Sequence, residues 1–173
     1  MKRTLDRTGI ADRDAPLRLM NEPIDSLKPH EKGGVEMPGQ NSVVVRRFVE
    51  EFQSKHDVAV AQELLAEDFV DGSPSAGLSP DRDGALTLHA ALFAAFPNLR
   101  VEIHDQIEEG DKVVTRKTLK GTHNGEFLGI AATGCPVAWN VIDILRVRDG
   151  KIVEHWNVVD TLTLMQQIGA IPT

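Results

Sequence analysis

Apolar residues recur along this chain with two different spacings, and the first spacing is helical. Between residues 41 and 96, apolar side chains return every three or four positions, which is typical of amphipathic helices. N-cap residues and prolines set the expected boundaries. The pattern predicts three helices, running from Asn41 or Ser42 to near His56, from the N-cap Asp57 through Leu65, and from the N-cap Ser79, with Pro80 in the first turn, to Pro97.

The spacing changes to two after Pro97. Leu99, Val101 and Ile103 alternate with polar residues, and further alternating segments follow with turn residues between them. The predicted strands cover about residues 99–104, 112–120, 137–147 and 152–159, and a last helix, capped by Asp160, covers 161–168. Helices followed by a run of antiparallel strands predict an α+β fold in which a curved sheet wraps around the helices.

The first forty residues have a different pattern. They contain prolines at positions 16, 23, 29 and 38 and the pair Gly33-Gly34, with one short amphipathic segment around residues 17–27. We interpret residues 1–40 as a partly irregular N-terminal arm and residues 41–173 as the folded domain. The arm is either loose or ordered by packing on its own domain or on a neighbouring subunit.

Length and composition exclude several classes of protein. A chain of 173 residues with 41% apolar residues is long enough for one domain with a substantial core. It has no run of 18 apolar residues and no apolar segment after its first charges, so we expect a cytoplasmic protein with neither membrane span nor signal peptide. A net charge of −7 argues against nucleic acid as a partner, and the single cysteine, Cys135, excludes a disulfide scaffold or a zinc module.

Several spaced motifs resemble one known family. They are Gly121-Thr122-His123-Asn124-Gly125-Glu126-Phe127-Leu128-Gly129-Ile130, Thr133-Gly134, Ile142-Asp143-Ile144, Asp149-Gly150-Lys151-Ile152-Val153-Glu154-His155-Trp156 and Val158-Val159-Asp160. In this order they resemble the SnoaL-like polyketide (ester) cyclases of the NTF2-like group, over about residues 43–170. The resemblance implies an α+β cone with a deep apolar pocket, usually in a homodimer, and no metal or organic cofactor. It also implies an intramolecular aldol ring closure of a polyketide ester by acid-base catalysis.

One position departs from the family pattern. The resemblance places the family's catalytic acid/base, an aspartate, two residues after the histidine of the Glu-His-Trp motif, and the matching residue here is Asn157. An amide does not exchange a proton near neutral pH, although its NH₂ group can hold a carbonyl or enolate oxygen. Another group must therefore move the proton.

The strand pattern offers Asp143 as that group. Asp143 is the lone carboxylate on one face of the third strand, in a row otherwise made of apolar residues, which is an expensive place for a charge. On the fourth strand, His155 and Asn157 share a face. A carboxylate that orients an imidazole is a recurrent acid-base arrangement, although a single buried aspartate or histidine is often only structural. We predict Asp143, His155 and Asn157 as the catalytic residues.

The pairing of these two strands depends on the turn between them. A two-residue turn at Asp149-Gly150 places Asp143 opposite Trp156, whereas a three-residue turn at residues 148–150 places it opposite His155. We favour the three-residue turn, because it gathers the polar residues on one face.

Six further side chains are candidates for the substrate pocket. Trp139 is the expected cavity wall, and His123 follows the second strand at a place that suits the pocket mouth or an exposed loop. Phenylalanines at helical spacing either fill the core or line the cavity of a cone fold. The predicted substrate-binding residues are Trp139, His123, Phe48, Phe52, Phe93 and Phe127.

The opposite face of the last hairpin is also apolar. With the three-residue turn it carries Ile142, Ile144, Ile152, Trp156 and Val158, whereas an antiparallel sheet normally leaves one face to water. A second copy that presents the same surface covers this face without further sequence. We therefore expect a homodimer built through the outer sheet face around Trp156.

Two functional classes remain open. The first is an enzyme without a cofactor that moves protons on a hydrophobic, polyketide-like carbonyl substrate, by aldol cyclisation or a related isomerisation or hydration. The second is a non-catalytic member of the NTF2-like group that binds a small apolar ligand or serves as a dimeric scaffold, and Asn157 is the residue that favours it.

Overall fold

The computed structural model describes residues 39–172, and the predicted arm before residue 39 lies outside the described residues. The helical elements are α2 (Gln40–Arg47), its π-helical continuation η2 (Phe48–Gln53), α3 (Val58–Leu64), α4 (Arg82–Ala95) and α5 (Thr161–Gln167). The strands are β1 (Leu65–Asp71), β2 (Arg100–Glu109), β3 (Lys112–Thr122), β4 (Pro136–Arg148) and β5 (Lys151–Val159). Within this range, none of the helices has the length and apolarity needed to cross a bilayer.

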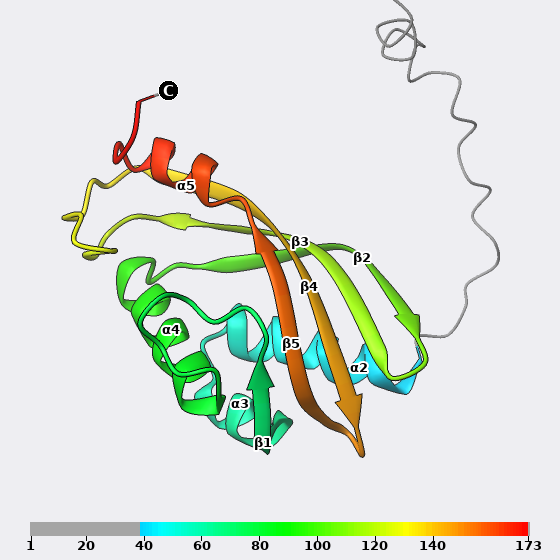
Figure 1. The fold of residues 1–173 in the computed structure, drawn as a ribbon. Helices are drawn as coiled ribbons and strands as arrows, with labels where there is room; N and C mark the ends of the chain where they lie inside the picture. Colours follow the sequence, from blue (N-terminus) through cyan, green and yellow to red (C-terminus); the bar gives the residue numbers. More distant parts are fainter. Residues whose placement is uncertain (1–38, 173) are drawn as a thin grey trace, which may run out of the picture. The chain divides into compact units, whose positions relative to one another are not determined.

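The five strands form one curved sheet in the order β1-β5-β4-β3-β2 (Figure 1). β2, β3, β4 and β5 are antiparallel neighbours, as the alternating pattern predicts. β1 differs from the prediction, because it pairs parallel to β5 at the edge of the sheet. The sequence pattern does not reveal β1, since this strand directly follows a helix and carries Glu67 and Asp68 among its apolar residues.

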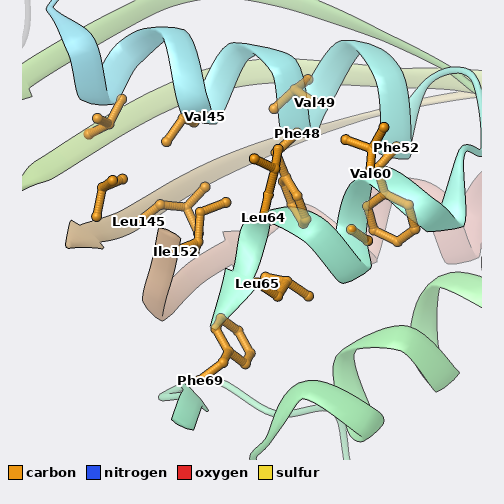
Figure 2. Packing of buried hydrophobic residues seen from close by; sticks show 13 residues of the cluster. Val45, Phe48, Val49, Phe52, Val60, Leu64, Leu65, Phe69, Leu145 and Ile152 are labelled. Carbon is orange, nitrogen blue, oxygen red and sulfur yellow. The ribbon is translucent and has the colours of Figure 1, made fainter. Parts of the chain in front are cut away.

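The helices α2, η2, α3 and α4 gather on one side of the curved sheet (Figure 1). Val45 of α2 and Val49 and Phe52 of η2 are fully buried. They belong to the same apolar cluster as Leu145 and Ile152 of the sheet (Figure 2). Burial of one apolar stripe per helix against the sheet supplies most of the stability of such a layer.

The hairpin between β4 and β5 has a two-residue turn. Asp149 and Gly150 both have positive φ, 52° and 73°, which is the backbone of a type I′ turn, so the predicted three-residue turn is wrong. A bulge at Val153 then shifts the pairing by one residue, and Asp143 lies opposite Asn157.

The turn and the bulge together decide which residues of β5 face inward. The extra residue at the bulge brings His155 and Asn157 to the same face as Asp143, so these three residues share one face as predicted. The two-residue turn pairs Ile152 with the inward-facing Val147, and Ile152 is fully buried there, so its predicted place on the outer face is wrong.

The first helix is anchored by a distant strand. It begins at Gln40 after Gly39, so Asn41 and Ser42 are not its N-cap. Instead, the Ser42 amide and hydroxyl donate to Glu108 Oε2 of β2 at 2.7 and 2.6 Å. A carboxylate at a helix N-terminus satisfies free amides and complements the helix dipole.

The other helices use caps close in sequence. Asp57 and Asp160 accept from the amides of Ala59 and Thr163 at 3.0 and 3.1 Å, which confirms both predicted caps. For α4 the predicted cap Ser79 is wrong, because Asp81 caps the helix by accepting from an amide two residues inside it. Ser79 donates its hydroxyl proton to that carboxylate at 2.6 Å.

Truncating Phe52 tests this core. Phe52 is 1% exposed and its ring lies 5.1 Å from that of Phe48, so Phe52→Ala leaves a cavity and lowers the free energy of unfolding by about 3–5 kcal/mol. Val43 lies in the preceding helix and is 55% exposed, and Val43→Ala changes that free energy by about 0.5 kcal/mol or less. Urea denaturation followed by circular dichroism measures both values. Equal losses in the two variants would contradict this description of the core.

Candidate active site

A pocket with a volume of about 550 Å³ opens between the sheet and α4. Every layer of the domain contributes to its largely apolar wall. The main apolar contributors are Phe48 from η2, Phe69 from β1, Leu92 from α4, Trp139 and Val141 from β4, and Leu164 from α5. A cavity of this size and composition suits a hydrophobic organic molecule that is held in place by a few polar groups.

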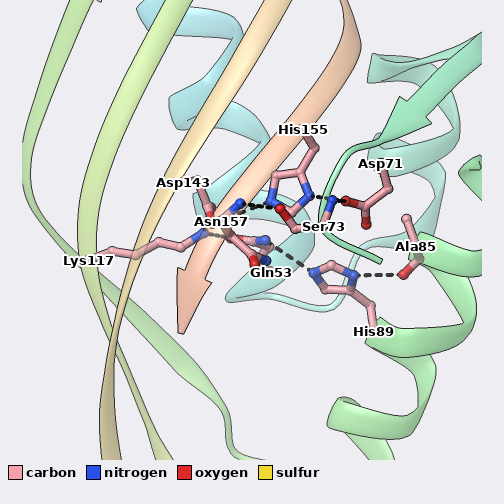
Figure 3. Close-up of polar contacts among 9 residues, drawn as sticks. All are labelled: Gln53, Asp71, Ser73, Ala85, His89, Lys117, Asp143, His155 and Asn157. Atoms are coloured by element: carbon pink, nitrogen blue, oxygen red, sulfur yellow. Dashed lines mark hydrogen bonds and ion pairs between the residues drawn. The ribbon is translucent and has the colours of Figure 1, made fainter. Parts of the chain in front are cut away.

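Four charged side chains lie in a row across four adjacent strands at this pocket. They are Lys117 from β3, Asp143 from β4, His155 from β5 and Asp71 from β1 (Figure 3). Lys117 forms an ion pair with Asp143 Oδ2, and the exposed fractions of these side chains are only 2% and 4%. His155 Nε2 lies 3.5 Å from Asp143 Oδ1, and its Nδ1 lies 3.1 Å from Asp71 Oδ1.

The row alternates in charge near neutral pH. Burial favours the neutral form of Asp143, but the charge of Lys117 and the hydrogen bond with His155 outweigh it and lower the Asp143 pKa to about 2. Burial likewise disfavours charged His155, but its hydrogen bonds with Asp143 and Asp71 prevail and raise its pKa to about 9. For Asp71, burial is outweighed by hydrogen bonds from His155 and the Ser73 amide, and its pKa is lowered. Two cations therefore alternate with two anions.

A chain of neutral groups supports the Lys117 end of this row. Lys117 Nζ donates to Gln53 Oε1 at 2.7 Å, and Gln53 Nε2 donates to His89 Nε2 at 3.1 Å. His89 Nδ1 in turn donates to the Ala85 carbonyl at 2.9 Å, an assignment that follows from the partners of the two ring nitrogens. Burial lowers the His89 pKa to about 4, so this imidazole is neutral at pH 7.

Backbone hydrogen bonds fix the other end. The Asp71 carboxylate accepts from the Ser73 amide at 2.9 Å, and the Gly72 amide donates to the His155 carbonyl at 2.7 Å. The backbone amide of Asn157 donates to Ser73 Oγ at 3.1 Å. The loop after β1 is thereby tied to β5, which holds the Asp71 carboxylate against His155.

The structure brings six of the nine predicted site residues to the pocket wall. These are Asp143, His155, Asn157, Trp139, Phe48 and Phe127. Phe52 and Phe93 lie behind the wall, with ring centroids 5.5 Å apart. Helical spacing alone does not separate the phenylalanine that faces the cavity from those one turn deeper.

His123 is placed in the core and not at the pocket mouth. It is fully buried, and its ring centroid lies 5.5 Å from that of Phe96. Its amide donates to the Cys135 carbonyl at 3.0 Å, and its Nδ1 lies 3.0 Å from Thr133 Oγ1. These bonds join the two ends of the loop after β3, and they turn the imidazole inward.

Sequence reasoning missed Lys117, Asp71, Gln53 and His89. Two of them carried a signal. Lys117 stands two residues from the inward-facing Leu119 on an alternating strand, and His89 lies one turn before Phe93 on the apolar side of α4. Asp71 carried no usable signal, because β1 itself was not recognised.

The arrangement offers an acid and a base to one substrate group. Protonated His155 presents Nε2–H beside the carboxylate oxygen of Asp143, and both are reached from an apolar cavity. Asn157 adds an amide to the same wall. Among residues 39–172, no group of three or more His, Cys, Asp or Glu side chains is arranged to hold a metal ion.

Comparisons with known proteins agree on one family. The family model for SnoaL-like polyketide cyclase matches residues 43–168. The aklanonic acid methyl ester cyclase DauD of Streptomyces sp. (strain C5) is 29% identical over 130 residues, which cover 73% of this chain and 80% of that protein.

Two solved structures are similar as well. IdmH, a proposed polyketide cyclase from Streptomyces antibioticus, is 34% identical with a TM-score of 0.67, over 76% of this chain and 99% of its own. AclR, a proposed hydroxylase from Streptomyces galilaeus, is 30% identical with a TM-score of 0.71, over 78% and 83% of the two chains. The match over most of the domain shows that this chain belongs to the SnoaL-like polyketide cyclase family.

Proposed function

We propose that this protein closes a ring in a hydrophobic polyketide-type carbonyl compound by an intramolecular aldol reaction. The observation that carries the proposal is the position of His155 between two carboxylates at the polar side of an apolar pocket. This arrangement holds an imidazolium, which is an acid, next to an ionised Asp143, which is a base. The cyclase names of distant relatives support the same reaction class.

The proposed reaction begins with proton removal. Asp143 takes a proton from the carbon beside a carbonyl group, while His155 Nε2–H binds the carbonyl oxygen as it becomes an enolate. The enolate carbon then attacks a second carbonyl carbon of the same molecule, which forms a C–C bond and converts the C=O π bond into an alkoxide.

Proton return completes the cycle. His155 gives its Nε2 proton to the alkoxide, and the proton on Asp143 returns to His155 across the 3.5 Å between them. The product is an isomer of the substrate, and both side chains end in their starting protonation states. Between the two proton transfers the row carries one net positive charge, which balances the negative charge on the enolate and then on the alkoxide.

Asp71 and Asn157 have supporting roles in this proposal. Asp71 accepts the Nδ1 proton of His155, which fixes the ring orientation so that Nε2 points to the substrate. Asn157 lies directly opposite Asp143 across the β4–β5 pair and offers an NH₂ donor to a substrate oxygen. Its amide moves no proton, and the acid-base work falls to the neighbouring pair.

Ligand binding without turnover is the second candidate function, and Asn157 is the observation that favours it. The relatives' names suggest aklanonic acid methyl ester as a test compound. A cyclase converts it into an isomer that chromatography separates from the starting ester at unchanged mass. A binding protein shows occupancy in equilibrium dialysis and no isomer.

Replacing the base tests the assignment. Asp143→Asn removes the proton acceptor and lowers turnover by about a hundredfold or more, while binding of the ester persists. Asp105 is the matched control, because this carboxylate is half-exposed and paired with Arg116. Asp105→Asn leaves turnover unchanged. Full activity in Asp143→Asn would remove Asp143 from the mechanism.

The pH profile provides an independent test. The reaction requires protonated His155, whose pKa is raised to about 9, and ionised Asp143, whose pKa is lowered to about 2. Activity is therefore retained through neutral pH and is lost as the pH rises through about 9. A profile of kcat/KM against pH measures this limb. A limb near 6.5, the ordinary histidine value, would contradict the role of the carboxylate-paired imidazolium.

We further propose that the outer sheet face joins two copies of this chain. Ile107, Val114, Ile144 and Trp156 are direct cross-strand neighbours from β2 to β5 and form one apolar row. Ile142 and Val158 pair in the next row of the same face, and Val158 is 75% exposed. Charged residues flank this strip, among them Arg116 on one side and Arg146 on the other. A two-fold partner with the same rows matches the strip, and exposed apolar residues gathered in this way are typical of an interface.

A charge on this face tests the dimer. Val158→Glu places a carboxylate within the proposed interface, where burial without a partner costs several kcal/mol, so the variant sediments as a monomer. Leu162→Glu is the control, because Leu162 is 61% exposed on α5, and this variant stays dimeric. Analytical ultracentrifugation at micromolar concentration measures both. A monomeric wild type would overturn the proposal.

A further inference from the structure

Lys117 is an unusual residue for the wall of an apolar pocket. Its side chain is 2% exposed, and its ammonium has two protein partners, Asp143 and Gln53. Removing an ammonium from water costs several kcal/mol, and a methionine of similar length would fill the same space without that cost. Packing alone therefore does not account for a lysine here.

We infer that Lys117 is a positioning residue that keeps Asp143 ionised and holds one of its carboxylate oxygens, so that the other oxygen is directed to His155 and the reaction. The inference rests on the proposed function, in which Asp143 is the base. Lys117 occupies Oδ2 of Asp143, and Oδ1 is the oxygen that faces His155. The two oxygens thus have separate partners: Lys117 holds Oδ2 in place, and Oδ1 faces the proposed acid, His155.

The ammonium is held in place from the helical side. Gln53 accepts a hydrogen bond from Lys117 and donates one to His89. His89 in turn donates to the Ala85 carbonyl of α4. Because His89 is neutral, it adds no second positive charge beside the ammonium. Groups from β3, η2 and α4 therefore define where the cation sits.

The charge balance explains why the cation matters. The ionisable groups that meet at this site are Lys117, Asp143, His155, Asp71 and His89, and with His89 neutral the other four cancel. Without Lys117, two carboxylates share one imidazolium in a buried site. The site then takes up a proton more readily, and a protonated Asp143 does not accept the substrate proton.

Lys117→Met tests the inference, because it removes the charge and keeps the length of the side chain. We expect the acid limb of the kcat profile to move up by about 1–3 pH units, the usual effect of an opposite charge at contact distance, with KM little changed. Lys117→Arg retains the charge and keeps the limb near its wild-type position. Lys120→Met is the control, since Lys120 is an exposed residue of β3 paired with Glu102, and it leaves the profile unchanged.

Carbon-13 NMR of the aspartate carboxyl groups gives a readout that does not need turnover. In Lys117→Met the Asp143 signal titrates about 1–3 units higher than in the wild type. If this variant does not fold, Lys117→Gln supplies an uncharged hydrogen-bond donor for the same measurement. An unchanged Asp143 titration overturns the inference. A shifted titration in a protein that cyclises no ester upholds the positioning role and rejects the proposed function.

Discussion

The structure depends on a row of alternating charges buried across one face of its sheet. Lys117, Asp143, His155 and Asp71 come from four adjacent strands, and each is stabilised by the neighbours beside it. Removing any one leaves an uncompensated charge in a poorly hydrated site, which costs far more than an exposed ion pair contributes. The register of the strands is therefore fixed by these charges as well as by the burial of apolar side chains. A strand that slipped by one residue would carry its charge to the outer face.

Two local irregularities make that row possible. The two-residue turn at Asp149-Gly150 alone would set Asp143 against Trp156, and the bulge at Val153 adds the one residue that brings Asn157 opposite instead. The turn pairs Ile152 with Val147 and places it in the core, and the bulge keeps His155 and Asn157 on the pocket face. The apolar pocket is thus combined with a polar site whose geometry depends on one extra residue.

Periodicity revealed much of this architecture because it reports burial on single elements. It predicts the four antiparallel strands and the shared face of Asp143 and His155, and local chemistry predicts the caps at Asp57 and Asp160. It fails where the decisive contact joins distant elements. The parallel strand that carries Asp71 has no alternation of its own, and its partner lies 84 residues away. The bulge appears in the sequence only as two consecutive apolar residues, Ile152 and Val153, and such a pair does not by itself distinguish a bulge from a simple shift of face.

The pairing of β1 with β5 also has a consequence for synthesis of the chain. Asp71 meets His155 only after the last strand has left the ribosome, although β1 is the first strand to be made. Until then β1 has no partner on the sheet, and the charges of the pocket are unbalanced. A nascent chain that stops before β5 has Lys117 and Asp143 but lacks both His155 and the strand that holds β1 and Asp71 on the sheet. Assembly of the site is thereby coupled to completion of the domain.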